Sequence, residues 1–98
     1  MNGKDKRHLR ALAHRLSPVV QVGQRGLTDA LVHQVDGALT AHELIKVRIG
    51  GESPADRDAA AALLCERTGC AVAGAIGRVL ILYRAHPETP RIVLPGGS

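Results

Sequence analysis

Helix-period and strand-period segments alternate along this chain, and the alternation limits the folds that it can adopt. Apolar residues recur every three to four positions in three segments, and short runs rich in β-branched residues lie between and after them. This order predicts two right-handed β-α-β crossovers followed by an antiparallel hairpin. The expected helices cover residues 4–16, 29–42 and 54–68, and the expected strands cover residues 19–22, 44–49, 70–76 and 79–83.

The predicted fold is therefore an α/β, two-layer sandwich in the order α-β-α-β-α-β-β, with a mixed sheet of about four strands. The chain has 98 residues, which fits a single domain over residues 1–98, with a core of about residues 4–84 and a tail of residues 85–98. Residues 79–82 are apolar at every position, which indicates a central strand. In the tail, Ile92-Val93-Leu94 is a candidate for a short edge strand.

Capping and turn residues mark the ends of these elements. Thr28 is a good N-cap for the second helix, and Ser53 followed by Pro54 predicts the start of the third. Gly69 is the expected C-cap of the third helix, and Gly77-Arg78 suits a two-residue type II′ turn. The first helix is expected to bury one apolar stripe, formed by Leu9, Leu12, Ala13 and Leu16.

Tyr83 is the only aromatic residue of the chain, so the core must consist of Ala, Val, Leu and Ile. This composition excludes the multi-ring stacking platforms on which many proteins bind single-stranded nucleic acid. The net charge is +4, and residues 1–25 alone carry +5. This asymmetry favours a polyanionic partner, which would be bound mainly through its backbone, although many small basic domains have no nucleic-acid role.

The sequence has no pattern typical of an enzyme or a metal site. The five histidines lack metal-ligand spacing, and there is neither a nucleophile elbow nor a P-loop. Cys65 and Cys70 are not spaced as C-x-x-C, so we expect reduced thiols. We therefore expect a non-enzymatic protein with no metal, no cofactor and no small-molecule substrate. No apolar run is long enough for a signal peptide or a membrane span, which predicts a cytoplasmic protein without a membrane partner.

The strongest candidate site is Gly23-Gln24-Arg25-Gly26, which lies between an expected strand and an expected helix. Two glycines let the backbone approach a ligand closely, and the N-terminus of the following helix favours phosphate. Arg25 adds a full positive charge at the tip of the loop. As a bare pattern, G-x-x-G is weak, and an ordinary strand-to-helix turn explains it about as well.

Four segments share a pattern with one family: residues 22–28 (VGQRGLT), 42–48 (HELIKVR), 76–84 (IGRVLILYR) and 92–95 (IVLP). Together they resemble the bacterial YhbY-type stand-alone CRM domain, named for chloroplast RNA splicing and ribosome maturation. The resemblance covers nearly the whole chain, in order and with similar spacing. It implies an RNA-binding fold similar to the C-terminal domain of translation initiation factor three, a loop like that of KH domains, and association with precursors of the large ribosomal subunit.

The resemblance also implies which residues contact RNA. The loop would clamp the RNA backbone, basic residues on the strands would surround it, and the first helix would add the basic start typical of the family. The tail departs from the family because Ala85-His86-Pro87-Glu88 carries less positive charge than expected. The expected RNA-binding residues are Gly23, Gln24, Arg25 and Gly26 in the loop, the basic neighbours Lys46, Arg48, Arg78 and Arg84 on or beside the strands, and Lys4, Lys6, Arg7 and Arg10 on the first helix.

Together with the resemblance, which implies ribosomal RNA as the partner, these residues predict a monomeric assembly factor that recognises RNA by phosphate geometry and folded shape, with limited base readout. Gly26→Asp is expected to weaken RNA binding with little loss of fold. The alternative is a protein-interaction module that docks on a ribosomal protein or an assembly factor without touching RNA. Affinity for RNA should fall steeply as salt rises, whereas an apolar docking site should respond little.

Overall fold

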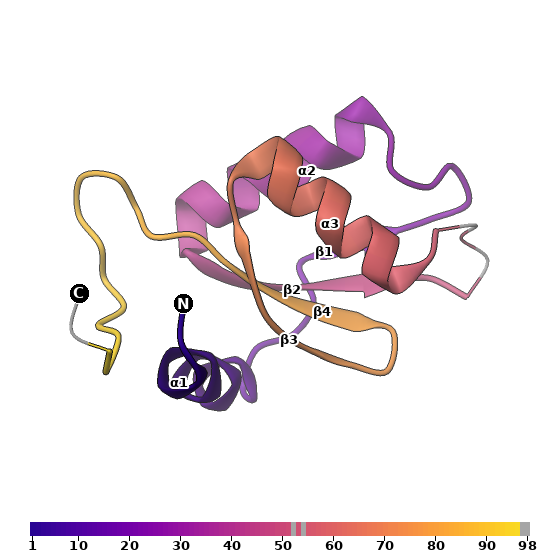
Figure 1. The fold of residues 1–98 in the computed structure, drawn as a ribbon. Coiled ribbons are helices and arrows are strands. Elements are labelled where there is room, and N and C mark those ends of the chain that lie inside the picture. Colours follow the sequence, from indigo (N-terminus) through magenta and orange to yellow (C-terminus); the bar gives the residue numbers. More distant parts are fainter. Residues whose placement is uncertain (52, 54, 97–98) are drawn as a thin grey trace.

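The computed structural model describes residues 1–51, 53 and 55–96 of the chain. Its elements follow the predicted order, and Figure 1 shows how they are arranged. The helices are α1 (Gly3–Ala13), α2 (Asp29–His42) and α3 (Arg57–Thr68), and the strands are β1 (Val20–Val22), β2 (Leu44–Ile49), β3 (Ala71–Ile76) and β4 (Val79–Tyr83).

The four strands form one mixed sheet in the order β1-β2-β4-β3. β1 pairs with β2 in parallel, while β4 pairs antiparallel with β2 on one side and with β3 on the other. The predicted α/β class, the mixed sheet and the central position of β4 are confirmed. Gly77 adopts φ +57° in the β3–β4 turn, the left-handed conformation that the first position of a type II′ turn requires.

Helices cover both faces of this sheet. α2 and α3 pack on one face and α1 crosses the other, so the structure has a third layer that a two-layer description leaves out (Figure 1). Alternate residues of β4 serve the two faces: Leu80 and Leu82 point into the larger core, and Ile81 and Tyr83 into the smaller one. The smaller core consists of Leu9, Ala13, Leu44, Ala73, Ile81 and Tyr83.

α1 is shorter than predicted, and this exposes part of its apolar stripe. The helix ends at Ala13, and only Leu9 and Ala13 of the stripe are buried. Leu12 and Leu16 remain 42% and 40% exposed. The expectation that all four residues face the core was therefore wrong for these two leucines, because α1 crosses only part of the sheet.

The start of α3 also differs from the prediction. Asp56, not Ser53, is the N-cap, and its carboxylate accepts a hydrogen bond from the amide of Ala59 at 3.0 Å. The Ser53 hydroxyl accepts one from the amide of Ala55 and closes a local turn instead. The predicted role of Pro54 lies outside the described residues. Gly69 caps the end of α3 at φ +74°, as predicted, and Thr28 caps the start of α2.

The tail does not form the edge strand expected at residues 92–94. Ile92 and Leu94 instead pack against the smaller core, while Val93 is 79% exposed. Two carboxylates bind backbone amides of the tail and hold it in place: Glu43 accepts from Ile92, and Asp5 accepts from Gly96 at 2.7 Å. These amides are consequently satisfied without a strand partner.

Candidate nucleic-acid interface

The loop of residues 23–26 connects β1 to α2 through a tight turn. The amide of Gly26 donates to the carbonyl of Gly23 at 3.0 Å, and Gly26 adopts φ +69°. Gly26 is buried, whereas Gln24 and Arg25 at the tip are exposed. The sequence therefore produces the predicted turn, and only its two central side chains project into solvent.

Beside this turn lies a hollow of about 370 Å³ that is open to solvent. Within the described part of the chain, the amides of Gln24 and Arg25 donate to no protein acceptor, so both remain available to a ligand. Asp29 in the first turn of α2 offsets the positive end of the helix, which leaves Arg25 as the main positive charge here. The hollow is lined by Gly23, Gln24, Arg25, Gly26, Thr28, Ala30, Leu31 and Gln34.

Arg48 and Arg78 lie at the same end of the sheet as this loop. Arg48 on β2 pairs with Gln21, one residue before the end of β1, and with Val79, the first residue of β4 after the turn at residues 77–78. Arg48 is exposed, and no hydrogen bond joins its side chain to the described residues. Arg78 donates through Nε to the carbonyl of Ile49 and through Nη2 to that of Gly50, both at 2.9 Å. Arg78 thus ties the hairpin turn to the end of β2.

Sequence reasoning missed Arg57, which lies at this end as well. Its Nη1 donates to the carbonyl of Gly77 at 2.9 Å, and its Nε contacts Asp58 at 3.1 Å. The contact with Gly77 spans 20 positions of sequence. Because the charge of Arg57 is paired with Asp58, it adds little positive potential to the surface.

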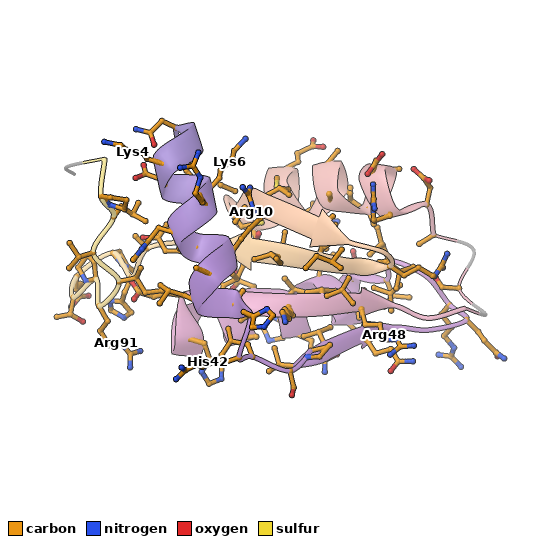
Figure 2. All side chains as sticks on the ribbon, turned by 90° about the horizontal axis from the view of Figure 1, so that it is seen from below. Lys4, Lys6, Arg10, His42, Arg48 and Arg91 are labelled. Carbon is orange, nitrogen blue, oxygen red and sulfur yellow. The ribbon has the colours of Figure 1, made fainter. Side chains whose placement is uncertain are left out.

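The basic residues of α1 form a separate group on the opposite side of the sheet from α2 and α3. Figure 2 shows Lys4, Lys6 and Arg10 along α1, which crosses the strands, and Arg48 toward the other end of the sheet. Lys4, Lys6 and Arg7 are exposed. The predicted RNA-binding residues therefore form two groups, one on α1 and one around the loop, rather than a single cluster.

Arg10 combines a surface charge with a structural contact. Its Nη1 donates to the carbonyl of Ala73 at 3.1 Å, and its aliphatic stem lies over Gly74. A Cβ at Gly74 would lie 2.6 Å from the Cδ of Arg10, closer than packed atoms come. Gly74 therefore lets α1 approach β3.

Lys46 and Arg84 are bound within the fold to different degrees. The Nζ of Lys46 donates to the carbonyl of Leu16 at 2.9 Å, which ties the α1–β1 connection to β2. Arg84 uses two nitrogens for four bonds, all to α2 and to the end of α3. Its partners are the Asp36 carboxylate at 2.6 Å, the Thr68 carbonyl at 2.7 Å, the Thr40 hydroxyl at 2.8 Å and the Asp36 carbonyl at 3.0 Å. A phosphate would have to displace these bonds, so the structure argues against Arg84 as an RNA contact.

Glu43 is a second feature that sequence reasoning missed. It ends α2 with φ +64°, a conformation that non-glycine residues rarely adopt, and it is buried. Its carboxylate accepts hydrogen bonds from the amides of His86, Arg91 and Ile92 at 2.8, 2.9 and 3.1 Å. Burial alone would raise the pKa of Glu43, but these amides and the charge of Arg91 outweigh it and lower the pKa. The carboxylate is therefore a structural anchor for the tail.

The two thiols lie within hydrogen-bond distance, with their Sγ atoms 3.6 Å apart, and they do not form a disulfide. Burial, together with the neighbouring Cys70, raises the pKa of Cys65 to about 11, which leaves it protonated and unreactive at neutral pH. Across residues 1–51, 53 and 55–96, no three His, Cys, Asp or Glu side chains are grouped as a metal site would require. None of the helices in the described ranges is long and apolar enough to cross a membrane.

Comparisons with known proteins agree with this architecture. A Bacillus subtilis protein with the name "Probable RNA-binding protein YqeI" is 37% identical over 95 residues, which is 97% of this chain and 99% of that protein. A Haemophilus influenzae protein named RNA-binding protein is 37% identical over 95 residues, covering 97% of this chain and 95% of its own length. The solution structure of protein SAV1595 from Staphylococcus aureus matches with a TM-score of 0.82 and 36% identity, over 97% of this chain and 99% of that one.

The family comparison covers the three helices and the whole sheet. Residues 1–84 match the CRS1/YhbY (CRM) domain, so the match ends just after β4 and before the tail. This confirms the resemblance that the four sequence segments indicated. The chain belongs to the CRS1/YhbY (CRM) domain family.

Proposed function

We propose that this protein binds the ribosomal RNA of large-subunit precursors, as a cytoplasmic monomer, and assists ribosome assembly without catalysing a reaction. The observation that carries the proposal is the exposed pair Gln24-Arg25, which is held between two glycines at the start of α2. The relatives named as RNA-binding proteins support RNA as the ligand.

The loop suits a phosphate for three reasons. The amides of Gln24 and Arg25 can donate to phosphate oxygens, since neither bonds to the described part of the fold. Arg25 adds a full charge, and Gly23 has no heavy atom within 4 Å of the position a Cβ would occupy, so the backbone is open to close approach. None of these contacts reads a base, so recognition would rest on the shape of the RNA.

Two groups of cations at separate places fit a folded RNA better than a short strand. Lys4, Lys6 and Arg7 project from α1, while Arg25 and Arg48 project near the loop end of the sheet. One RNA element that touches both groups would have to span the sheet face that α1 leaves open. Such a footprint favours structured RNA, which offers phosphates at fixed separations.

Salt dependence of RNA affinity tests the proposal. Each phosphate contact releases about 0.9 counterion from duplex-like RNA and about 0.7 from single strands, so Arg25→Gln should reduce the slope of log affinity against log salt by about that amount. The matched control is Arg91→Gln, because Arg91 is also exposed and lies in the tail, at the opposite end of the molecule from Arg48 (Figure 2). An equal slope in wild type and the Arg25 variant would remove the loop from the interface.

The ribosomal part of the proposal needs a test in cells. Ultraviolet crosslinking followed by sequencing of the attached RNA should recover ribosomal RNA of the large subunit. In sucrose gradients at low salt, the protein should sediment with large-subunit precursors and be released by high salt. If it stays at the top of the gradient in cells that are assembling ribosomes, the assembly role is wrong, although RNA binding could still hold.

A further inference from the structure

An apolar groove lies away from the loop. It measures about 560 Å³ and lies between the end of α1, the start of β1, the end of α2 and the tail. Leu12, Leu16 and Val19, which are 42%, 40% and 49% exposed, converge on it. The groove residues are Leu12, Arg15, Leu16, Ser17, Val19, His42, Leu44, Ile45 and Ile92.

Two internal contacts hold the walls of this groove in place. The Nζ of Lys46 donates to the carbonyl of Leu16 at 2.9 Å and fixes the wall that contains Leu16. On the opposite side, the Glu43 carboxylate accepts from the amide of Ile92 at 3.1 Å and fixes the wall formed by the tail. A groove whose shape is set in the free protein loses little conformational entropy when it binds a partner.

The lining favours a polypeptide over RNA. Six of the nine groove residues are aliphatic and none is Phe, Tyr or Trp, so most of the lining suits apolar side chains. Only the planar groups of His42 and Arg15 at the polar rim could stack on a base. Three exposed aliphatic side chains also gather at this one place, and such apolar patches usually mark interaction sites.

The charges around the groove indicate the kind of polypeptide. Arg15 and His42 line it, and neither side chain has a hydrogen-bond partner in the described ranges. Arg91, which directly precedes Ile92, is exposed and donates to the carbonyl of Ala41 at 2.9 Å beside His42. The nearby carboxylate of Glu43 is buried and already accepts three amides. The rim is therefore basic, without an exposed carboxylate among its lining residues.

We propose that this groove binds an acidic amphipathic segment of a protein partner. Aliphatic side chains of the segment would enter between Leu12, Leu16 and Ile92, while its Asp and Glu residues would meet Arg15 and His42. This binding would be additional to RNA binding and independent of it. The protein would then join an RNA through its loop and α1, and a protein through this groove.

Peptide selection with the full-length protein tests the chemistry of the groove. A display library of random 12-residue peptides is panned against the wild type and against Leu12→Ser combined with Leu16→Ser. Peptides selected on the wild type should combine aliphatic residues with Asp or Glu. They should bind the double variant at least about tenfold more weakly, a loss of about 1.4 kcal/mol, because the variant lacks two of the apolar side chains that line the groove. Arg15→Glu should weaken them similarly. Val93→Ser, which removes an exposed apolar side chain outside the groove, should not.

Methyl-detected NMR of the wild type then locates the bound peptide. The methyl groups of Leu12, Leu16, Val19 and Ile92 should shift on addition of a selected peptide. Selection of basic peptides, or of peptides that ignore both the double variant and Arg15→Glu, would overturn the proposal. So would shifts of these methyls caused by an RNA oligonucleotide or by self-association at higher protein concentration.

RNA binding by the same variant separates this inference from the proposed function. The Leu12→Ser, Leu16→Ser protein should keep wild-type RNA affinity and circular dichroism, because both leucines are partly exposed in the wild type. If its RNA affinity falls while its fold is intact, the groove belongs to the RNA site and the inference is wrong. If the wild type binds no RNA but binds the peptides, the inference stands and the proposed function fails.

Discussion

The loop of residues 23–26 and the tail of residues 85–96 are both irregular backbone, but their amides have different partners. In the tail, four amides donate to carboxylates of the same chain: those of His86, Arg91 and Ile92 to Glu43, and that of Gly96 to Asp5. In the loop, the amides of Gln24 and Arg25 donate to nothing in the described part of the fold.

Four amides of the tail hold the chain in place, whereas the amides of Gln24 and Arg25 in the loop are free of hydrogen bonds with the described fold. A carboxylate and a phosphate are both oxyanions, and backbone amides bind either one. The tail uses this chemistry internally, with buried side chains as the acceptors. The loop keeps these two amides and the Arg25 side chain free of the described fold, and we propose that they bind an acceptor from outside. We therefore expect changes in the tail to alter stability and changes in the loop to alter RNA affinity.

The largest expected effect is the loss of the Glu43 carboxylate. Glu43→Ala should reduce the free energy of unfolding by about 3 kcal/mol, because three partly buried amides lose a charged acceptor. Glu43→Gly should lose about 1 kcal/mol less, since glycine accepts the φ of +64° without strain. Urea denaturation measures both. If Glu43→Ala matches Glu66→Ala, an exposed control on α3, the tail is not held as described.

Two arginines give the next test, because they were expected to play the same role. Arg84→Gln should cost about 2 kcal/mol of stability, since it breaks four bonds within the fold, and should leave the salt dependence of RNA binding unchanged. Arg48→Gln should do the opposite, with a slope lower by about 0.7 to 0.9 and nearly wild-type stability. Urea denaturation and salt titration of RNA binding, applied to both variants, test these two roles. A reduced salt slope for a folded Arg84→Gln protein would mean that Arg84 contacts the RNA after all.

The loop glycines test binding without unfolding. Gly26→Asp is a poorer probe than the sequence indicated, because Gly26 is buried at φ +69° and any side chain there costs about 1 kcal/mol of stability. Gly23→Asp avoids this cost, since a Cβ at Gly23 meets nothing within 4 Å. It should lower RNA affinity about tenfold by repelling phosphate. Gly23→Asn, of the same size without the charge, should have a much smaller effect, and equal losses would mean that size matters rather than charge.

Lowering the pH is expected to have the smallest effect, and this effect is on the stability that Glu43 contributes. The pKa of Glu43 is lowered in the fold from an ordinary value of 4.5, so its contribution to stability is complete above that pH. It should be lost as the pH falls through the lowered folded value. The difference in unfolding free energy between wild type and Glu43→Gln should therefore narrow below about pH 4.5. A difference that stays constant down to pH 2 would show that ionisation of this carboxylate does not anchor the tail.

Local signals predicted much of the fold. The element order, the cap at Thr28, the left-handed Gly69 and the Gly77 turn depend on residues close together in sequence, and the structure confirms each. The cap of α3 was wrong by a few positions because Ser53 and Asp56 both suit that role, and only the structure shows which amide each one reaches.

Long-range partners could not be predicted. Arg84 and Asp36 are 48 positions apart, and Asp5 and Gly96 are 91 positions apart, so no local pattern indicated either pair. Basic residues in a sequence look alike whether they face solvent or the fold, which is why Arg84 was grouped with Arg48. The apolar groove was missed for a similar reason, because Leu12 and Leu16 follow the period of a buried stripe.

The single tyrosine of this chain is a natural spectroscopic probe. Tyr83 is the only aromatic residue, and it is buried under α1 with Leu9 and Ala13. Burial, with the charges of Glu43 and Asp5, raises its pKa above the ordinary value of 10.0. Intrinsic fluorescence and phenolate absorbance therefore report on this one face without any label. Release of α1 or the tail should change both signals, whereas an RNA confined to the loop at residues 23–26 should leave them unchanged.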